Sequence, residues 1–194
     1  MASITRTPIL VTPGDPAGIG AEIALRAYMA GCHDFFLIEN ATRMTALAHD
    51  LNLNMQVQKI SRPADFHQEN KALQVLDIDW PTTPVLGAPD VANARPVIDA
   101  IETGAKWAQD GTVAAVVTNP IAKATLYDAG FAYPGHTEFL GSIAPVRAGG
   151  PAMMLACDML RVVPVTVHIP LSAVASSLTP ELIIDKGRLV ANAL

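Results

Sequence analysis

Aromatic and charged residues are scarce in this chain of 194 residues, at 5% and 16% of the sequence. Few aromatic side chains leave little surface on which nucleic-acid bases could stack. The 13 Lys and Arg residues are outnumbered by 18 Asp and Glu residues, and no basic run occurs. Because binding to a phosphate backbone depends on clustered positive charge, we expect no nucleic-acid partner.

Cysteine is rare, and long apolar runs are absent. Cys32 and Cys157 lie far apart without a CxxC or Cys/His pair, which argues against a disulfide framework or a structural zinc site. We predict that both are small buried side chains. The first apolar run ends at Pro13, too early for a signal peptide, and no run reaches the roughly 20 residues of a transmembrane helix. We therefore expect a cytoplasmic protein that has no membrane segment.

Short β-rich runs alternate with longer helical segments along the chain, within a composition that is 51% hydrophobic. This alternation predicts an α/β fold, with helices on both faces of a mostly parallel sheet. The strands are expected at residues 8–12, 34–39, 55–60, 73–78, 112–118, 152–156 and 162–167, with helices at 19–30, 42–51, 93–109, about 121–129 and from 180 to the end. Residues 61–93, rich in proline, are otherwise predicted to be irregular. The continuous apolar run 112–118 is typical of a central parallel strand.

Two loops that follow predicted strands contain groups able to hold an anion. The loop at residues 14–20 joins a strand to a helix, so its amides could face an anion, but a tight turn with close packing explains its glycines equally well. After the strand at 112–118, Thr118, Asn119 and Lys123 surround a second strand-to-helix junction. Lys123 could bind a phosphate or carboxylate there, or it could be a solvated helix residue.

Two histidines are candidate functional residues. His136 and Thr137 lie near a predicted helix start, where an imidazole and a hydroxyl could bind an anionic ligand or move a proton, although Thr137 could also be a plain N-cap. His168 follows the predicted strand 162–167. Histidine at a strand end is often structural. As a metal ligand, His168 would need two or three partners, and the other histidines do not lie at a spacing from it that is typical of metal ligands.

Four sequence blocks together resemble the 4-hydroxythreonine-4-phosphate dehydrogenase family of pyridoxal phosphate biosynthesis. They are TPGDPAGIG at 12–20, TNPIAK at 118–123, YPGHTEFLG at 133–141 and MLRVVPVTVHIPL at 159–171. The similarity corresponds to the N-terminal part of a longer family protein, so we expect a truncated chain. TNPIAK has Asn119 where many members of the family have Gly or Ala, and we expect this side chain to crowd any close approach of two backbones.

The resemblance implies an isocitrate or isopropylmalate dehydrogenase-like fold, with a first α/β domain at 1–130 and the start of a second at 131–194. It implies a homodimer in which His136 and Thr137 bind a small phosphorylated acid and His168 binds a divalent metal (Zn, Mg or Co) in a site shared between subunits. The implied reaction is NAD- or NADP-dependent oxidation of an alcohol followed by loss of carbon dioxide, in which a metal can act as a Lewis acid. The residues that bind the cofactor are not identified by the motifs.

Three functions are compatible with these features. The first is the dehydrogenase reaction, on 4-hydroxythreonine 4-phosphate or a related four-carbon acid phosphate. The second is a non-catalytic remnant that only binds ligand, which would expose apolar surface normally covered in the longer protein. The third is an acyl- or phosphate-transferring enzyme of related architecture, which the absence of a recognisable nucleophile motif disfavours.

Overall fold

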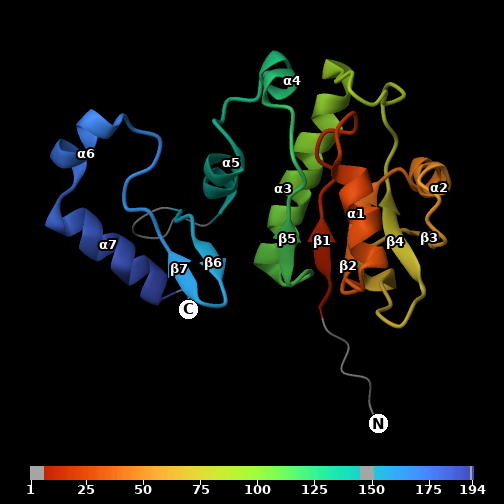
Figure 1. Ribbon diagram of the computed structural model, residues 1–194, viewed down its shortest axis with the longest axis horizontal. Helices are drawn as coiled ribbons and strands as arrows, with labels where there is room; N and C mark the ends of the chain where they lie inside the picture. Colours follow the sequence, from red (N-terminus) through yellow and green to blue (C-terminus); the bar gives the residue numbers. More distant parts are fainter. Residues whose placement is uncertain (1–6, 145–150, 193) are drawn as a thin grey trace, which may run out of the picture. The chain divides into compact units, whose positions relative to one another are not determined.

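The computed structural model describes residues 7–144, 151–192 and 194, and the chain divides into two compact units (Figure 1). One unit ends at His136 and the other begins at Thr137, whereas the sequence analysis places the domain boundary after residue 130. That these units are two domains remains a prediction. Residues 1–6, at the start of the segment considered as a signal peptide, lie outside the described residues, as does residue 193 in the final predicted helix.

The first unit is built on a five-stranded sheet in the order β3-β4-β2-β1-β5, and every neighbouring pair is parallel. This sheet, with its helices, confirms the predicted α/β class. The strands are β1 (Ile9–Val11), β2 (Phe35–Glu39), β3 (Gln56–Ile60), β4 (Ala72–Asp77) and β5 (Ala115–Val117).

Four α-helices accompany this sheet, and their ends follow local sequence signals. They are α1 (Gly20–Met29), α2 (Ala41–Asp50), α3 (Ala94–Asp110) and α4 (Lys123–Asp128), with 3-10 turns at Pro63–Asp65 and Val91–Asn93. The side chain of Asn40 caps α2 by accepting from the Arg43 amide, and α3 ends at Gly111, whose φ is 81°. No helix in the described ranges is both long and apolar enough to cross a membrane.

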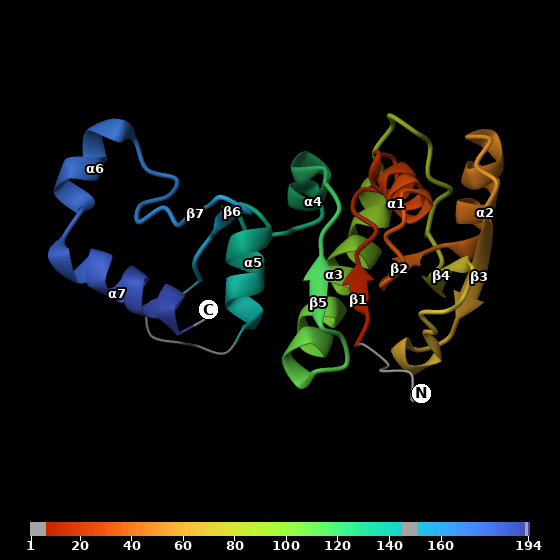
Figure 2. The same cartoon turned by 60° about the horizontal axis from the view of Figure 1, so that its bottom comes forward.

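Apolar side chains alternate between the two faces of the sheet and form two separate cores. Val11, Phe35 and Leu37 belong to a buried cluster with residues of α1 and α2, whereas Leu10 and Phe36 belong to a second cluster that includes Ala100 of α3. Figure 2 shows α3 running alongside β5. Since successive strand residues point to opposite faces, a short apolar strand can supply both cores, and helices on both faces are confirmed.

The strand predicted at 112–118 is shorter than expected and does not lie at the centre of the sheet. β5 spans three residues and, within the described residues, pairs with β1 alone, so that it forms the edge of the sheet. Val116 packs against the second core, whereas Val117 is 48% exposed. An apolar run identifies a strand, but it does not show how many neighbours that strand has.

The second unit contains short elements with little buried apolar surface. They are α5 (His136–Ile143, which begins one residue before the division), β6 (Leu155–Cys157), β7 (Leu160–Val162), α6 (Leu171–Ser177) and α7 (Pro180–Ala191). The hydroxyl of Thr179 accepts from the Leu182 amide, which confirms the predicted start of the last helix. Among the described residues of this unit, Phe139 alone has a buried side chain.

The buried strands expected at 152–156 and 162–167 are not found, and the burial expected for Cys32 and Cys157 is wrong. The chain forms an antiparallel hairpin of β6 and β7 that ends at Val162, not a buried strand at 162–167, and both strands of the hairpin are exposed. Pro164 lacks an amide donor and therefore disfavours continuation of the strand. Cys157 is exposed because it lies in this exposed hairpin, and Cys32 is exposed because it follows the end of α1.

Candidate functional site

The carboxyl ends of β1 and β5 are tied together by Asn119 and the glycines of the preceding loop. The buried Asn119 side chain donates to the carbonyl oxygens of Thr12 and Gly20, at 3.0 and 3.2 Å. A Cβ atom added at Gly14 would lie 2.5 Å from the Pro120 carbonyl oxygen. The two backbones therefore do approach closely, and Asn119 stabilises this contact through its hydrogen bonds instead of being excluded from it.

The amides of the loop at residues 14–20 largely bond within the protein. The Asp15 amide donates to the Pro120 carbonyl, the Ala17 amide to the Asp15 carboxylate, and the Gly18 amide to the Asp15 carbonyl, at 2.9, 3.0 and 2.9 Å. A carboxylate already accepts from one of the amides that an anion would use. Of the two interpretations of this loop, the geometry favours the tight turn with close packing.

An ion pair that was not predicted from the sequence contacts the same loop at Pro16. The guanidinium of Arg43 donates to the Glu39 carboxylate at 2.8 Å and to the Pro16 carbonyl at 2.5 Å. Burial raises the pKa of Glu39, and the charge of Arg43 and the hydrogen bonds from Asn40 and Trp80 offset only part of that effect. Glu39 ends β2 and Arg43 lies in α2, so the pair joins two elements, and the four-residue spacing of a single helix could not have revealed it.

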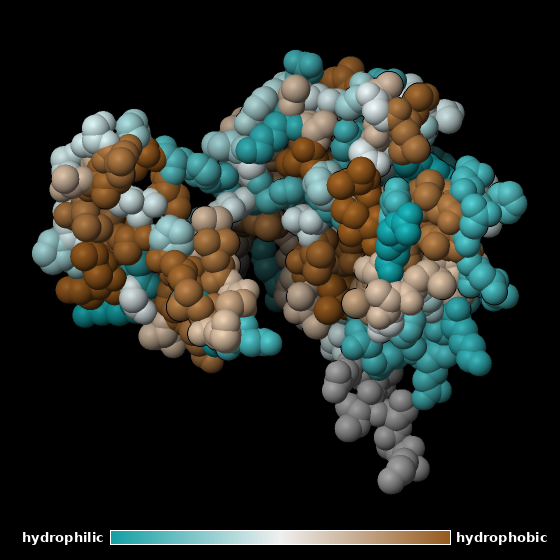
Figure 3. Space-filling view, in the orientation of Figure 1, coloured by the Kyte–Doolittle hydropathy of each residue, from teal (hydrophilic) through white to brown (hydrophobic). Residues whose placement is uncertain are grey.

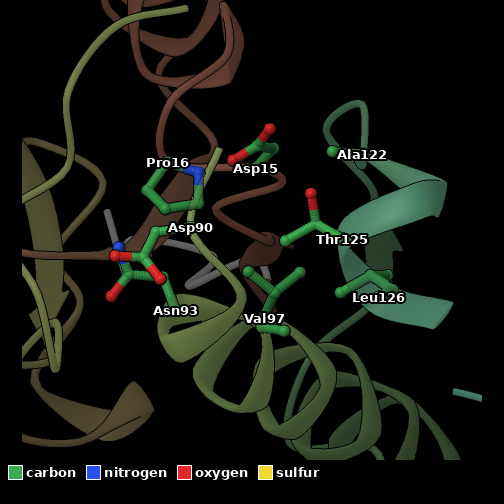
Figure 4. A pocket seen from close by; sticks show the side chains of 9 residues that line it. Asp15, Pro16, Asp90, Asn93, Val97, Ala122, Thr125 and Leu126 are labelled. Atoms are coloured by element: carbon green, nitrogen blue, oxygen red, sulfur yellow. The ribbon is translucent and has the colours of Figure 1, made fainter. Parts of the chain in front are cut away.

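A small pocket lies beside this loop, lined by Asp15, Asp90, Asn93 and Thr125 among others (Figure 4). Its volume of about 10 Å³ leaves room for about one water molecule, so the pocket is too small for a substrate. The carboxylate of Asp90 already accepts hydrogen bonds from the Ala92 amide and the Thr82 hydroxyl, and these bonds lower its pKa.

His136 is the first residue of α5 and has an unsatisfied buried nitrogen. Its Nε2 atom is buried and has no hydrogen-bond partner within the described part of the protein. Burial, followed by the charge of Lys123, lowers the pKa of this imidazole below its ordinary value. A buried polar atom without a partner is costly, so a ligand that supplies the partner would gain affinity there.

Thr137 and Glu138 follow His136 in the first turn of the same helix. Because α5 begins at His136, Thr137 lies inside the helix, and the N-cap interpretation of this residue is wrong. Its side chain is exposed, whereas Glu138 is half-buried. An exposed hydroxyl in a first helical turn is well placed to donate to an anion, because the helix dipole is positive at that end.

His168 lies six residues beyond the last strand instead of at its end. It has a φ of 58°, in the left-handed region that residues other than glycine seldom adopt. Its Nε2 atom lies 3.5 Å from the Oε1 atom of Glu138. In the described ranges, no three His, Cys, Asp or Glu side chains are grouped closely enough to hold a metal, so the metal-ligand role expected for His168 stays a prediction.

Comparison with known proteins identifies the family of the chain. A family model described as pyridoxal phosphate biosynthetic protein PdxA matches residues 31–194. Curated proteins named 4-hydroxythreonine-4-phosphate dehydrogenase are similar to the chain. The protein from Caulobacter vibrioides is 41% identical, and the match covers 98% of this chain and 59% of the relative. The protein from Methylorubrum populi is also 41% identical, and the match covers 98% of this chain and 57% of the relative. This chain therefore belongs to the PdxA family, and it spans less than two thirds of the length of these relatives.

The fold agrees with solved structures that have the same name. A 4-hydroxythreonine-4-phosphate dehydrogenase from Klebsiella pneumoniae matches with a TM-score of 0.78 at 29% identity, covering 91% of this chain and 56% of its own. The structure from Burkholderia phymatum gives the same TM-score at 27% identity, covering 92% and 55%. The similarity extends through nine-tenths of this chain and includes residues of both units.

Proposed function

We propose that this chain takes part in the metal- and NAD- or NADP-dependent oxidation and decarboxylation of 4-hydroxythreonine 4-phosphate in pyridoxal phosphate biosynthesis. The observation that supports this most directly is the buried, unpartnered Nε2 atom of His136, close enough to Lys123 for the ammonium charge to act on it. The substrate is taken from the names of the relatives. A related four-carbon acid phosphate is the alternative substrate.

His136 and Thr137 bind the phosphate group of the substrate in this proposal. A neutral imidazole donates one N–H bond, and the threonine hydroxyl donates a second, while the amides at the start of α5 favour negative charge. The lowered pKa of His136 keeps the ring neutral near pH 7, so the attraction for phosphate comes from hydrogen bonding and from the nearby ammonium of Lys123.

A divalent ion would be held by His168. Its imidazole, with the carboxylate of Glu138 beside it, has the chemistry to bind such an ion, but the described residues do not bring a third ligand to the pair. When bound, the ion supplies Lewis-acid polarisation of a substrate oxygen. We propose that a homodimer located in the cytoplasm completes this site with ligands from the partner subunit. The contribution of this chain is to fix one imidazole and to bind and orient the phosphorylated end of the substrate.

The reaction is tested by the absorbance of reduced nicotinamide with the purified chain, 4-hydroxythreonine 4-phosphate, NAD or NADP, and zinc or magnesium. We expect an increase that depends on metal and substrate, that is weaker in His136→Ala and that is lost in His168→Ala. A flat trace from folded protein that still binds the substrate would contradict turnover by this chain.

A second candidate function, ligand binding without turnover, is favoured by exposed apolar surface. Met159 and Leu171 are 94% and 89% exposed, and an open groove of about 620 Å³ lies along α1, β1 and β5, bordered by Ile23 and Val117. Figure 3 shows apolar side chains at the surface of both units. Exposed apolar surface of this kind is typical of interaction sites and ligand-binding grooves. The flat trace described above would support this second function.

A further inference from the structure

We propose that Tyr127 is a positioning residue of the phosphate site, because its hydroxyl ties the turn before His136 to the helix that carries Lys123. This inference rests on the proposed binding of phosphate by His136. It starts from one contact, since the Tyr127 hydroxyl lies 3.3 Å from the carbonyl oxygen of Pro134 and donates to it. All four residues belong to the first unit, so the contact lies within one compact part of the chain.

The spacing along α4 places Lys123 and Tyr127 on the same side of that helix. Lys123 is the first residue of α4, and Tyr127 follows four residues later. Side chains four residues apart on a helix lie one above the other on the same face. Pro134, which Tyr127 contacts, is two residues before His136. The face of α4 that carries the ammonium is therefore also the face that holds the turn leading to His136.

The rest of this turn is also built on α4. The Phe131 amide donates to the Leu126 carbonyl oxygen at 2.9 Å, and both side chains are buried. The ring of Phe131 contacts the ring of Tyr133, with 5.4 Å between their centroids. These contacts fix the start of the turn, whereas the Tyr127 hydroxyl contacts its other end, close to His136. Loss of that hydroxyl should therefore loosen mainly the end that bears the imidazole.

The contact brings two anion-binding groups toward one ligand. Within the described residues, the buried Nε2 atom of His136 has no hydrogen-bond partner and no carboxylate pairs with the ammonium of Lys123. Burial, and then the charge of Lys123, lower the pKa of the His136 ring. An ammonium and an imidazole N–H that face one phosphate make charge-assisted hydrogen bonds, whose strength depends on distance and alignment. A shift of His136 away from Lys123 should therefore weaken the binding of phosphate.

The alternative is that the contact only stabilises the turn. Tyr127 is 46% exposed, and a hydroxyl at the surface can exchange its partner for water at little cost. The two roles differ in what they predict for a variant that lacks the hydroxyl. A contact that only stabilises the turn leaves the affinity of the folded protein for phosphate unchanged, whereas a positioning contact alters that affinity while the fold stays intact.

The test uses the full chain labelled with ¹⁵N and follows the ring nitrogens of His136 during a titration with inorganic phosphate. Tyr127→Phe removes the hydroxyl and keeps the ring. Its matched control is Tyr28→Phe, because the Tyr28 hydroxyl donates to the carbonyl oxygen of Asn70 at 3.2 Å, elsewhere in the first unit. We expect Tyr127→Phe to raise the dissociation constant of phosphate by about fivefold, Tyr28→Phe to leave it unchanged, and Lys123→Met to raise it by at least about tenfold.

The possible outcomes separate this inference from the proposed function. If phosphate shifts the His136 signals with the same dissociation constant in the parent chain and in Tyr127→Phe, the inference is wrong and the phosphate-binding role of His136 stands. If phosphate leaves the His136 signals unchanged in the parent chain, both the inference and that role are wrong. If Tyr28→Phe weakens binding as much as Tyr127→Phe does, the effect is a general loss of order in the first unit, and the inference is overturned.

Discussion

The two units of the chain differ sharply in how they bury their side chains. In the first unit, Leu10 and Phe36 are fully buried on one face of the sheet and Leu37 on the other, whereas Met159 and Leu171 of the second unit are almost fully exposed. Since buried apolar area supplies most of the stability of a fold, the first unit should dominate the stability of this chain. His168, the proposed metal ligand, belongs to the second unit, where few side chains are buried.

The largest effect is expected from truncation of a core side chain in the first unit. Phe36→Ala removes a fully buried ring that contacts Phe66 and Trp107, and it should lower the free energy of unfolding by about 4 kcal/mol. The control Leu171→Ala, at an exposed position in the second unit, should change it by less than about 0.5 kcal/mol. Urea unfolding followed by circular dichroism measures both. Equal losses in the two variants would show that the proposed difference between the units is wrong.

A smaller loss is expected from the ion pair that holds the loop at residues 14–20. Arg43→Met leaves the buried carboxylate of Glu39 without its charged partner and should cost about 3 kcal/mol. Arg26→Met, which removes an arginine with the same spacing to Glu22 on the exposed face of α1, should cost less than about 0.5 kcal/mol. Tryptophan fluorescence during urea unfolding reports both values. If Arg43→Met lowers the free energy of unfolding by no more than Arg26→Met does, the ion pair of Arg43 with Glu39 does not stabilise the first unit.

The next effect in size concerns the junction between β1 and β5. Asn119→Ala leaves the carbonyl oxygens of Thr12 and Gly20 without their donor in a buried position, and it should cost about 2 kcal/mol. Asn54→Ala, at an exposed loop position, is the matched control and should be nearly neutral. Thermal unfolding of both variants measures the two effects. An unchanged unfolding midpoint for Asn119→Ala would exclude a structural role for this side chain.

The smallest effect is a dependence on pH that comes from His136. Because its pKa is lowered in the fold, its contribution to stability is present above the ordinary value near 6.5 and is lost as the pH falls through the lowered value. A proton NMR titration of the ring should give a midpoint below 6.5, and Lys123→Met should raise that midpoint by removing the positive charge. A midpoint that stays the same in Lys123→Met would show that this ammonium does not act on His136.

The strands and helices of the first unit could be predicted because their signals are local. A continuous apolar run identifies β2, and the Asn40 cap marks the start of α2. The edge position of β5 could not be predicted, since an apolar strand has the same sequence pattern with one neighbour or two. In the second unit, the structure has a hairpin of β6 and β7 in place of the strand expected at 162–167, and both strands of the hairpin are exposed in the described part of the chain.

The candidate site was predicted in part. His136, Thr137 and His168 were chosen from motifs, and the structure adds that Nε2 of His136 is buried without a partner. The contacts of His168 with Glu138 and of Arg43 with Pro16 join residues that are distant in the sequence. Such contacts depend on how the elements pack, and a local pattern does not contain that information.

The central claim is that the first turn of α5 binds the phosphate of the substrate, and calorimetry with 4-hydroxythreonine 4-phosphate tests it most directly. We predict that His136→Ala weakens binding by about tenfold or more, since a hydrogen bond to a charged group is lost. His49→Ala, which removes an exposed imidazole on α2, should leave the dissociation constant unchanged. Equal affinity of the parent chain and His136→Ala would contradict the account.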